Sequence, residues 1–206
     1  ASGVSVGHHT HSHLHMPEEP FEVVKKDFLK ASGRFFEELG EIPRLFAYPY
    51  GEMSLNIVRF IKKSGFLAAF GQHSGVMASS DDLFTLPRYA MNERFGAIDR
   101  FQMVVNSLPL KIYNATPTEH LITNTNPPAI GFSIKKSLGK NHRLQCFVSH
   151  EGRAAIETLG TQRIEIRAKK PFPLGRTRLN CTMPGPTGRW HWMGRMFLNP
   201  APGKIR

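Results

Sequence analysis

Apolar residues recur at three- and four-residue steps in three stretches of the first half of the chain, which predicts three amphipathic helices. Prolines, capping residues and glycines mark their ends and place them at about residues 21–39, 55–64 and 97–107. Short apolar runs before and between them are typical of buried strands: 4–6, 45–48 and 66–70. Strands and helices that alternate at this spacing predict a parallel α/β sheet or barrel.

The first predicted strand begins almost at the start of the chain, which has no initiator Met. Three strands are too few to close a barrel or to complete a core of their own. We therefore expect further sequence upstream of residue 1, and the question of a targeting segment there stays open.

The pattern changes after Leu110. Residues 111–128 contain three prolines together with Asn and Thr, which predicts a linker or a loop that leads into a second unit. Short strand-like runs separated by turn residues then follow, and they are typical of a small all-β sandwich: 129–134, 144–149, 163–168, 178–183 and 190–198. The expected organisation is an α/β domain over residues 1–110 and a β-sandwich domain over residues 129–206.

The distribution of charge divides the chain at the same place. Residues 1–110 hold 11 Lys and Arg against 12 Asp and Glu, whereas residues 111–206 hold 16 against 4. A basic second half could contact an anionic glycan, nucleic acid or a membrane surface, or it could simply present a solvated basic face. No uninterrupted apolar run approaches the roughly 20 residues of a membrane span, so no such span is expected.

The two cysteines, Cys146 and Cys181, each lie in a strand-like run and lack the CxxC spacing of a metal site. Two strands of one sandwich can bring them together as a disulfide, which would indicate an oxidising compartment. Two buried free thiols are the alternative.

Five histidines fall within eight residues between the first predicted strand and the first helix. Imidazole is the commonest protein ligand of zinc and its first-row neighbours. The spacing of His9 and His13, or of His11 and His15, lets two imidazoles flank one pocket, but a catalytic zinc usually takes three protein ligands. No nearby acid is an obvious third ligand. Metal binding is the prediction, and a tag remnant or a solvated loop is the alternative.

Two segments together resemble the polysaccharide deacetylases, carbohydrate esterase family 4. The segment His9-Thr-His-Ser-His13 is similar to the family's His-Ser/Thr-x-x-His metal motif, and Phe46-Ala-Tyr-Pro-Tyr-Gly51 resembles its Arg-x-Pro-aromatic-Gly loop. Their order and the amphipathic helix between them also fit. The segments Phe70-Gly-Gln-His-Ser-Gly75 and Leu86-Pro-Arg88 resemble bacterial members, so the resemblance covers about residues 1–110.

The resemblance implies a distorted (β/α) barrel that removes the acetyl group from an N-acetylated amino sugar in a polysaccharide or oligosaccharide. A divalent metal ion, with zinc favoured, would be held by one Asp and two His, which here are His9 and His13. An Asp would act as general base. The substrate would lie against the turn of Pro49, Tyr50 and Gly51, where the Tyr50 N–H would help to hold the developing oxyanion.

The sequence departs from this family pattern in two respects. The Asp-Asp motif lies upstream of the histidines in the family, so the general base and the third metal ligand are absent from these 206 residues. The Arg of the Arg-x-Pro loop is replaced by Ala47. Arg88 or Arg94 is the candidate to replace it, with a surface or structural arginine as the alternative.

The remaining aromatic and histidine candidates each have two interpretations. The family uses a late His as general acid, for which His73 is the candidate in the first half; a plain exposed loop histidine is the alternative. Trp190 and Trp192 share one face of the last predicted strand, where core packing is favoured over stacking on a sugar. Three further histidines are expected on the surface: His120, His142 and His150.

We therefore expect a carbohydrate deacetylase with a glycan substrate and no nucleic-acid partner, in a bacterial periplasmic or extracellular location. A homo-oligomer is compatible with the sequence. The main alternative is a catalytically inactive glycan-binding protein on a degenerate deacetylase fold. A nucleic-acid-binding module is less favoured, because the basic half contains no recognisable basic helix or base-stacking motif.

Overall fold

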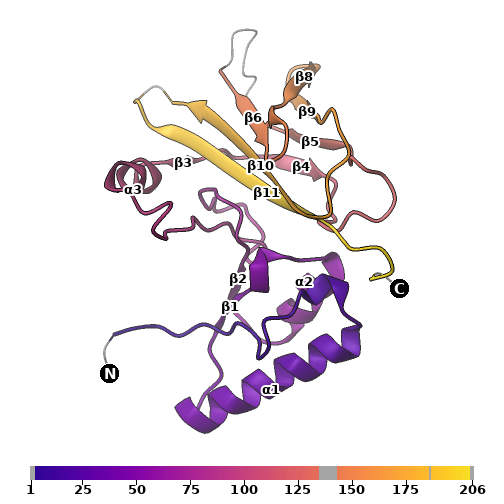
Figure 1. The fold of residues 1–206 in the computed structure, drawn as a ribbon. Coiled ribbons are helices and arrows are strands. Elements are labelled where there is room, and N and C mark those ends of the chain that lie inside the picture. The colour runs from indigo at the N-terminus through magenta and orange to yellow at the C-terminus, as the bar shows by residue number, and fades with distance from the viewer. Residues whose placement is uncertain (1–2, 135–142, 186, 205–206) are drawn as a thin grey trace.

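The structure is a computed structural model that describes residues 3–134, 143–185 and 187–204. His142, expected on the surface, lies outside the described residues. Figure 1 shows an N-terminal part with the helices α1 and α2 beside two short strands, and a larger part built of longer strands next to it. The described helices include none that is long and apolar enough to cross a membrane.

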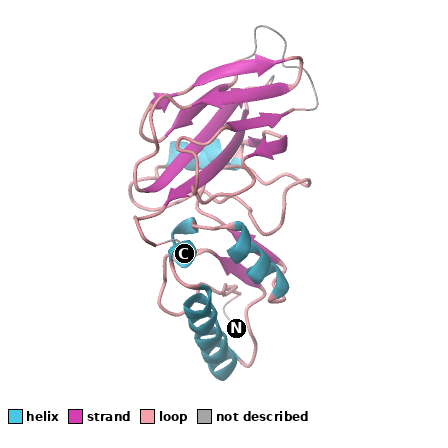
Figure 2. Cartoon of the chain, turned by 90° about the vertical axis from the view of Figure 1, so that its right-hand side faces the viewer, coloured by secondary structure: helices cyan, strands magenta, loops and turns pink. Residues whose placement is uncertain are grey.

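The N-terminal part contains helices and strands in alternation, as the apolar pattern predicts. Its elements are η1 (Met16–Glu18), α1 (Phe21–Leu39), β1 (Leu45–Ala47), η2 (Pro49–Gly51), α2 (Leu55–Lys63) and β2 (Ala68–Phe70). The next helix, α3 (Ile98–Val105), lies beside the strands of the C-terminal part (Figures 1 and 2). Gly40 ends α1 in the left-handed conformation at φ 75°. The Ser54 hydroxyl caps α2 by accepting a hydrogen bond from the Ile57 N–H. The three predicted helices are therefore confirmed.

The sheet of the N-terminal part is smaller than the sequence predicts. β1 and β2 pair in parallel, and residues 4–6 do not form the expected strand. Instead, the next residues along the chain reach β1, and His8 forms a single parallel bridge with it. The His8 N–H donates to the Leu45 carbonyl (2.8 Å), and the Ala47 N–H donates to the His8 carbonyl (2.9 Å). The α/β class is confirmed, but the described residues close no barrel, so the barrel is not confirmed.

The C-terminal part is built of two sheets. Its strands are β3 (Leu108–Pro109), β4 (Tyr113–Thr116), β5 (Ile130–Ser133), β6 (Gln145–Val148), β7 (Gly152–Arg153), β8 (Ala155–Leu159), β9 (Arg163–Arg167), β10 (Gly175–Pro184) and β11 (Trp190–Asn199). One sheet has the order β3-β11-β10-β6-β7 and the other has the order β4-β5-β9-β8. Figure 2 shows these strands gathered at one end of the molecule and the longest helix at the other.

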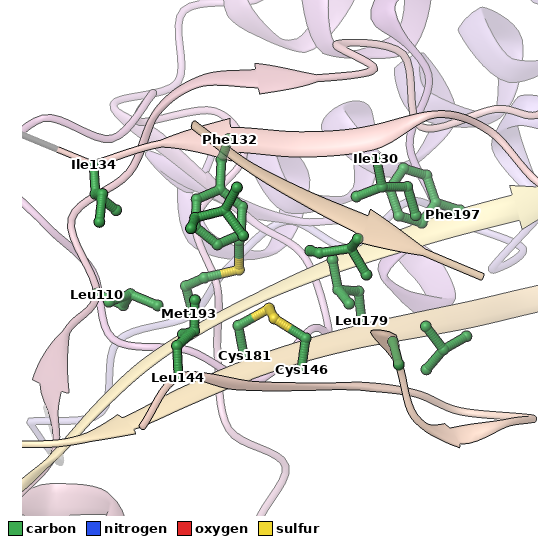
Figure 3. Close-up of a cluster of buried hydrophobic side chains, with 14 of the residues drawn as sticks. Leu110, Ile130, Phe132, Ile134, Leu144, Cys146, Leu179, Cys181, Met193 and Phe197 are labelled. Carbon is green, nitrogen blue, oxygen red and sulfur yellow. A yellow bond between two sulfur atoms is a disulfide. The ribbon is translucent and has the colours of Figure 1, made fainter. Parts of the chain in front are cut away.

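The two sheets bury one shared hydrophobic cluster. Phe132 of β5 and Ile164 of β9 contribute from one sheet, and Leu179 of β10 contributes from the other. Cys146 and Cys181 lie directly opposite each other on β6 and β10 and form a disulfide within this cluster (Figure 3). The disulfide, rather than a pair of free thiols, is therefore the form that the structure contains.

Three expectations for the second half are changed by the fold. The segment expected as a linker, 111–128, contains β4, which pairs with β5. Trp190 is 41% exposed and does not fill a core, while Trp192 is half-buried against the ring of Tyr89. His120 is buried and its Nδ1 donates to the Met196 carbonyl of β11, so the predicted surface position is wrong. His150 is exposed, as expected.

Candidate functional site

The histidine-rich loop, residues 8–15, runs from the edge of β1 to η1. Its conformation is fixed from the side by Asp27 of α1, whose carboxylate accepts hydrogen bonds from the N–H groups of His11 (3.0 Å) and Ser12 (3.1 Å). This arrangement exposes His11 and brings the loop beside the turn that follows β1.

His8 is a core residue. It is fully buried, its ring stacks on Phe28 at a centroid distance of 4.7 Å, and its Nε2 lies 3.2 Å from the Ser32 hydroxyl. Burial lowers the pKa of His8 to about 4, so the ring is neutral at pH 7. A ring enclosed in this way supports packing and is not accessible to a ligand.

His9 and His13 lie next to each other, as their predicted role requires. Their ring centroids are 4.8 Å apart with the planes at 69°. The His9 Nδ1 lies 2.6 Å from the Ala47 carbonyl, which can only accept a hydrogen bond, so Nδ1 carries the proton and Nε2 keeps its lone pair. Burial, assisted by the neighbouring His9 and His15, lowers the pKa of His13. The lowered pKa of His13 favours its neutral form, which is the form that can bind a metal ion.

The turn after β1 lies directly against this pair. The Tyr50 ring is 4.3 Å from the ring of His13, and both residues adopt the left-handed backbone region with φ 54°. Non-glycine residues in that region are strained and concentrate at functional sites. The turn is closed by hydrogen bonds from the Gly51 N–H to the Tyr48 carbonyl and from the Glu52 N–H to the Pro49 carbonyl. Neither bond uses the Tyr50 N–H.

Gly51 is required by the turn for two separate reasons. Its φ is +71°, and a Cβ at this position would overlap the backbone nitrogen and the Cβ of Gln72. We expect Gly51→Ala to reduce the free energy of unfolding by about 2–3 kcal/mol, because backbone strain and steric overlap add. Chemical denaturation would measure this loss.

Gly40→Ala is the matched control for this prediction. Gly40 has φ +75° but open space around the position of a Cβ, so only the backbone strain applies there. A smaller loss of about 1 kcal/mol is expected. Equal losses in the two variants would contradict the steric overlap with Gln72.

Glu52 is a buried carboxylate that the sequence analysis did not identify. It is 2% exposed, and its Oε2 lies 2.7 Å from the His15 Nδ1. Burial raises the pKa of the Glu52 carboxyl, and the contacts with His15 and Arg176 oppose that increase. The His15 ring stacks on Tyr50 at 4.0 Å with the planes at 4°. The pair of His15 and Glu52 thus supports the Tyr50 ring from one side.

Arg176 of β10 also contacts the turn, although it lies far away in the sequence. Its Nη1 donates to the Tyr50 carbonyl (3.2 Å) and to the Gln72 Oε1 (3.2 Å), and its guanidinium lies 5.4 Å from the centre of the Tyr50 ring. Its Nε is 3.6 Å from the Glu52 Oε1. The C-terminal part therefore supplies an arginine to the Tyr50 turn.

These contacts all involve the loop of His9 and His13 and the turn of Tyr50, which are the two segments that carry the resemblance. Residues 1–69 match the sequence model of the polysaccharide deacetylase family. We call these residues the deacetylase segment. The match confirms the resemblance for this third of the chain and indicates a hydrolase that deacetylates carbohydrate. No curated protein matches the chain.

The two arginine candidates lie outside the deacetylase segment and are engaged elsewhere. The Arg88 Nε donates to the Gly71 carbonyl (2.8 Å), and Arg94 lies over the ring of Phe95. Among the described residues, no hydrogen bond, ion pair or ring contact joins either arginine to His9. Arg176, in contrast, contacts the Tyr50 turn.

His73 also lies beyond the deacetylase segment, and its environment differs from both interpretations of the sequence. It is 5% exposed, so it is not an exposed loop histidine. Burial, with smaller effects from His120 and Arg195, lowers its pKa to about 3. The His73 ring is therefore neutral at pH 7 in this environment.

The described residues offer His9 and His13 as a pair of imidazole ligands. Within residues 3–134, 143–185 and 187–204, no group of three or more His, Cys, Asp or Glu side chains could hold a metal ion. His9 and His13 fit as two ligands, because the Ala47 carbonyl orients the His9 ring and the two rings lie in contact with each other.

Proposed function

We propose that this protein hydrolyses the acetamide of an N-acetylated amino sugar in a polysaccharide or oligosaccharide, with His9 and His13 as ligands of a divalent metal ion, zinc being favoured. The observation that carries this proposal is the contact of His9 with His13 and of His13 with Tyr50, inside the deacetylase segment. A metal bound there would polarise the acetamide carbonyl and activate a water molecule.

The residues of the Tyr50 turn are proposed to bind the substrate and its developing negative charge. The Tyr50 N–H is not used by the two hydrogen bonds that close the turn, so it is available to an oxyanion. Pro49 and Gly51 fix the direction of that N–H. His15 and Arg176 hold the Tyr50 ring from two sides, which keeps the donor in place before substrate arrives.

In this proposal residues 1–110 form the catalytic domain and residues 129–206 form an accessory β-sandwich. The resemblance assigns the general base and the third metal ligand to an Asp-Asp motif upstream of the histidines. The disulfide in the β-rich part is compatible with a periplasmic or extracellular location, where an oxidising environment preserves it.

Acetate release is the direct test of this function. The protein expressed from its complete reading frame would be supplied with zinc and incubated with oligosaccharides of N-acetylglucosamine. We expect stoichiometric release of acetate and of free amino groups, loss of both on chelation, and recovery when zinc is restored. Binding of the oligosaccharides without any acetate release would identify a glycan-binding protein instead and would overturn the proposal.

The role of Arg176 gives a prediction of its own. Arg176→Met is expected to lower kcat roughly tenfold or more with little change in KM, because Arg176 orients a donor that acts in the transition state. The loss corresponds to a charge-assisted hydrogen bond of about 1.5–3 kcal/mol. Steady-state kinetics would measure it, and Arg176→Lys should recover part of kcat.

Arg178→Met is the control for this measurement, because Arg178 lies two residues further along β10 and is also half-buried. It makes no hydrogen bond or ion pair with the Tyr50 turn among the described residues. A similar fall in kcat in both variants would mean that Arg176 acts through general destabilisation of β10.

A further inference from the structure

A second cleft lies between the N-terminal and C-terminal parts, separate from the histidine-rich loop. Its volume is about 550 Å³, which is in the usual range of small-molecule sites. Its lining includes Val58 of α2 and His73 of the loop after β2, together with His120 and Arg195 from the C-terminal part. None of the residues that line it belongs to the loop of residues 8–15 or to the Tyr50 turn.

Two buried polar atoms of this cleft have no hydrogen-bond partner. They are the His73 Nδ1 and the Arg195 Nη1. A buried polar group without a partner costs about 1–3 kcal/mol, and more when the group is charged. Such atoms are rare in folded proteins unless a ligand or a water molecule satisfies them. Both residues line the cleft, and the Arg195 Nη1 can only donate, so a ligand that accepts hydrogen bonds would satisfy it.

The charge of Arg195 specifies the kind of ligand. Burial lowers the pKa of Arg195 to about 10, which leaves the guanidinium charged at pH 7. Its Nη2 donates to the Pro117 carbonyl and its guanidinium lies over the ring of Phe197, but no ion pair of the described residues includes it. A buried cation of this kind is stabilised strongly by an anion that takes the free Nη1.

The remaining polar groups of the cleft suit a ligand that also carries hydroxyl groups. The His120 Nδ1 donates to the Met196 carbonyl (2.9 Å), so its Nε2 is left as an acceptor. Asp81 and Asp82 add carboxylates to the lining, and each accepts one backbone hydrogen bond, from Ala78 and Phe84. Hydroxyl groups can donate to these acceptors.

We propose that this cleft binds a sugar acid, with the carboxylate on the Arg195 Nη1 and the His73 Nδ1 and the hydroxyl groups on His120 and the two aspartates. A carboxylate fits better than a phosphate, because the lining offers one cation and two carboxylates, which would repel a dianion more strongly. This proposal does not depend on the deacetylase function.

Binding of D-glucuronate tests the proposal directly. Calorimetric titration of the unmodified protein should detect binding of glucuronate and at least tenfold weaker binding of glucose, which has the same ring without the charge. The ring signals of His73 and His120 in NMR spectra should shift as glucuronate is added. Arg195→Met should abolish glucuronate binding, and Arg195→Lys should retain part of it.

Arg153→Met is the matched control, because it removes one positive charge from an exposed position on β7 and should leave binding unchanged. Three results would overturn the proposal: no detectable binding of glucuronate to the unmodified protein, equal binding of glucose, or binding of glucose 6-phosphate without binding of glucuronate. All of these measurements are independent of acetate release, so a failure here leaves the deacetylase proposal intact, and the reverse also holds.

Discussion

Replacement of either His9 or His13 by Ala is expected to lower kcat/KM for acetate release by at least about 100-fold. Loss of a residue that only supports a metal ligand typically costs about 10–100-fold in affinity or activity, and loss of the ligand itself should cost more. The rings of His9 and His13 are 4.8 Å apart, so each variant leaves a single imidazole from this pair. Metal analysis of the purified variants and acetate release at saturating zinc would measure the two effects.

His11→Ala is the control for these variants, because His11 lies in the same loop but is exposed and held through its backbone by Asp27. It should leave both metal content and acetate release unchanged. Acetate release that survives both His9→Ala and His13→Ala would exclude the proposed site. Metal uptake that survives the double change would instead assign the ligands to His11 and His15.

The sequence predicts the helices well and the sheets less well, for a physical reason. The periodic apolar faces of α1 and α2, with Gly40 and Ser54 at their ends, are local signals that tertiary packing reinforces. Strand β4 has no comparable local signal in the sequence. It is held by pairing with β5, which follows only after a proline-rich loop. Strand β8 is mostly exposed, so its alternation of apolar and polar residues is weak.

The candidate site divides in the same way between local and long-range features. His9, His13 and Tyr50 belong to two short motifs, and in the structure His13 contacts both His9 and Tyr50. Arg176 is separated from Tyr50 by 126 residues, and no local pattern could assign it to the turn. Glu52 follows the turn directly and could have been considered as a buried acid.

His73 and His120 illustrate a further limit of sequence reasoning. A histidine in a Gly- and Ser-rich loop is usually exposed, and His73 was considered as such. Its burial results from packing of the loop after β2 against β11, where the Val76 N–H donates to the Trp192 carbonyl (3.4 Å). Contacts between the two parts of the chain therefore decide which of the titratable groups are accessible.

Removal of the disulfide is expected to reduce the free energy of unfolding by roughly 3–4 kcal/mol, on the basis of the chain entropy of the closed loop. Cys146 and Cys181 are separated by 35 residues and are fully buried in the core shared by the two sheets. Denaturant unfolding of the oxidised protein, the reduced protein and the variant with both cysteines replaced by Ala would measure the loss.

The comparison between the reduced protein and the double Ala variant separates the effect of the covalent link on stability from the effect of side-chain packing. Reduction removes the covalent link and keeps the sulfur atoms, whereas the double variant also leaves a cavity among residues such as Leu179 and Phe197. We therefore expect the double variant to be the less stable of the two. Alkylation of two thiols in the non-reduced, unfolded protein, detected by mass spectrometry, would show that the disulfide does not form and would contradict the prediction.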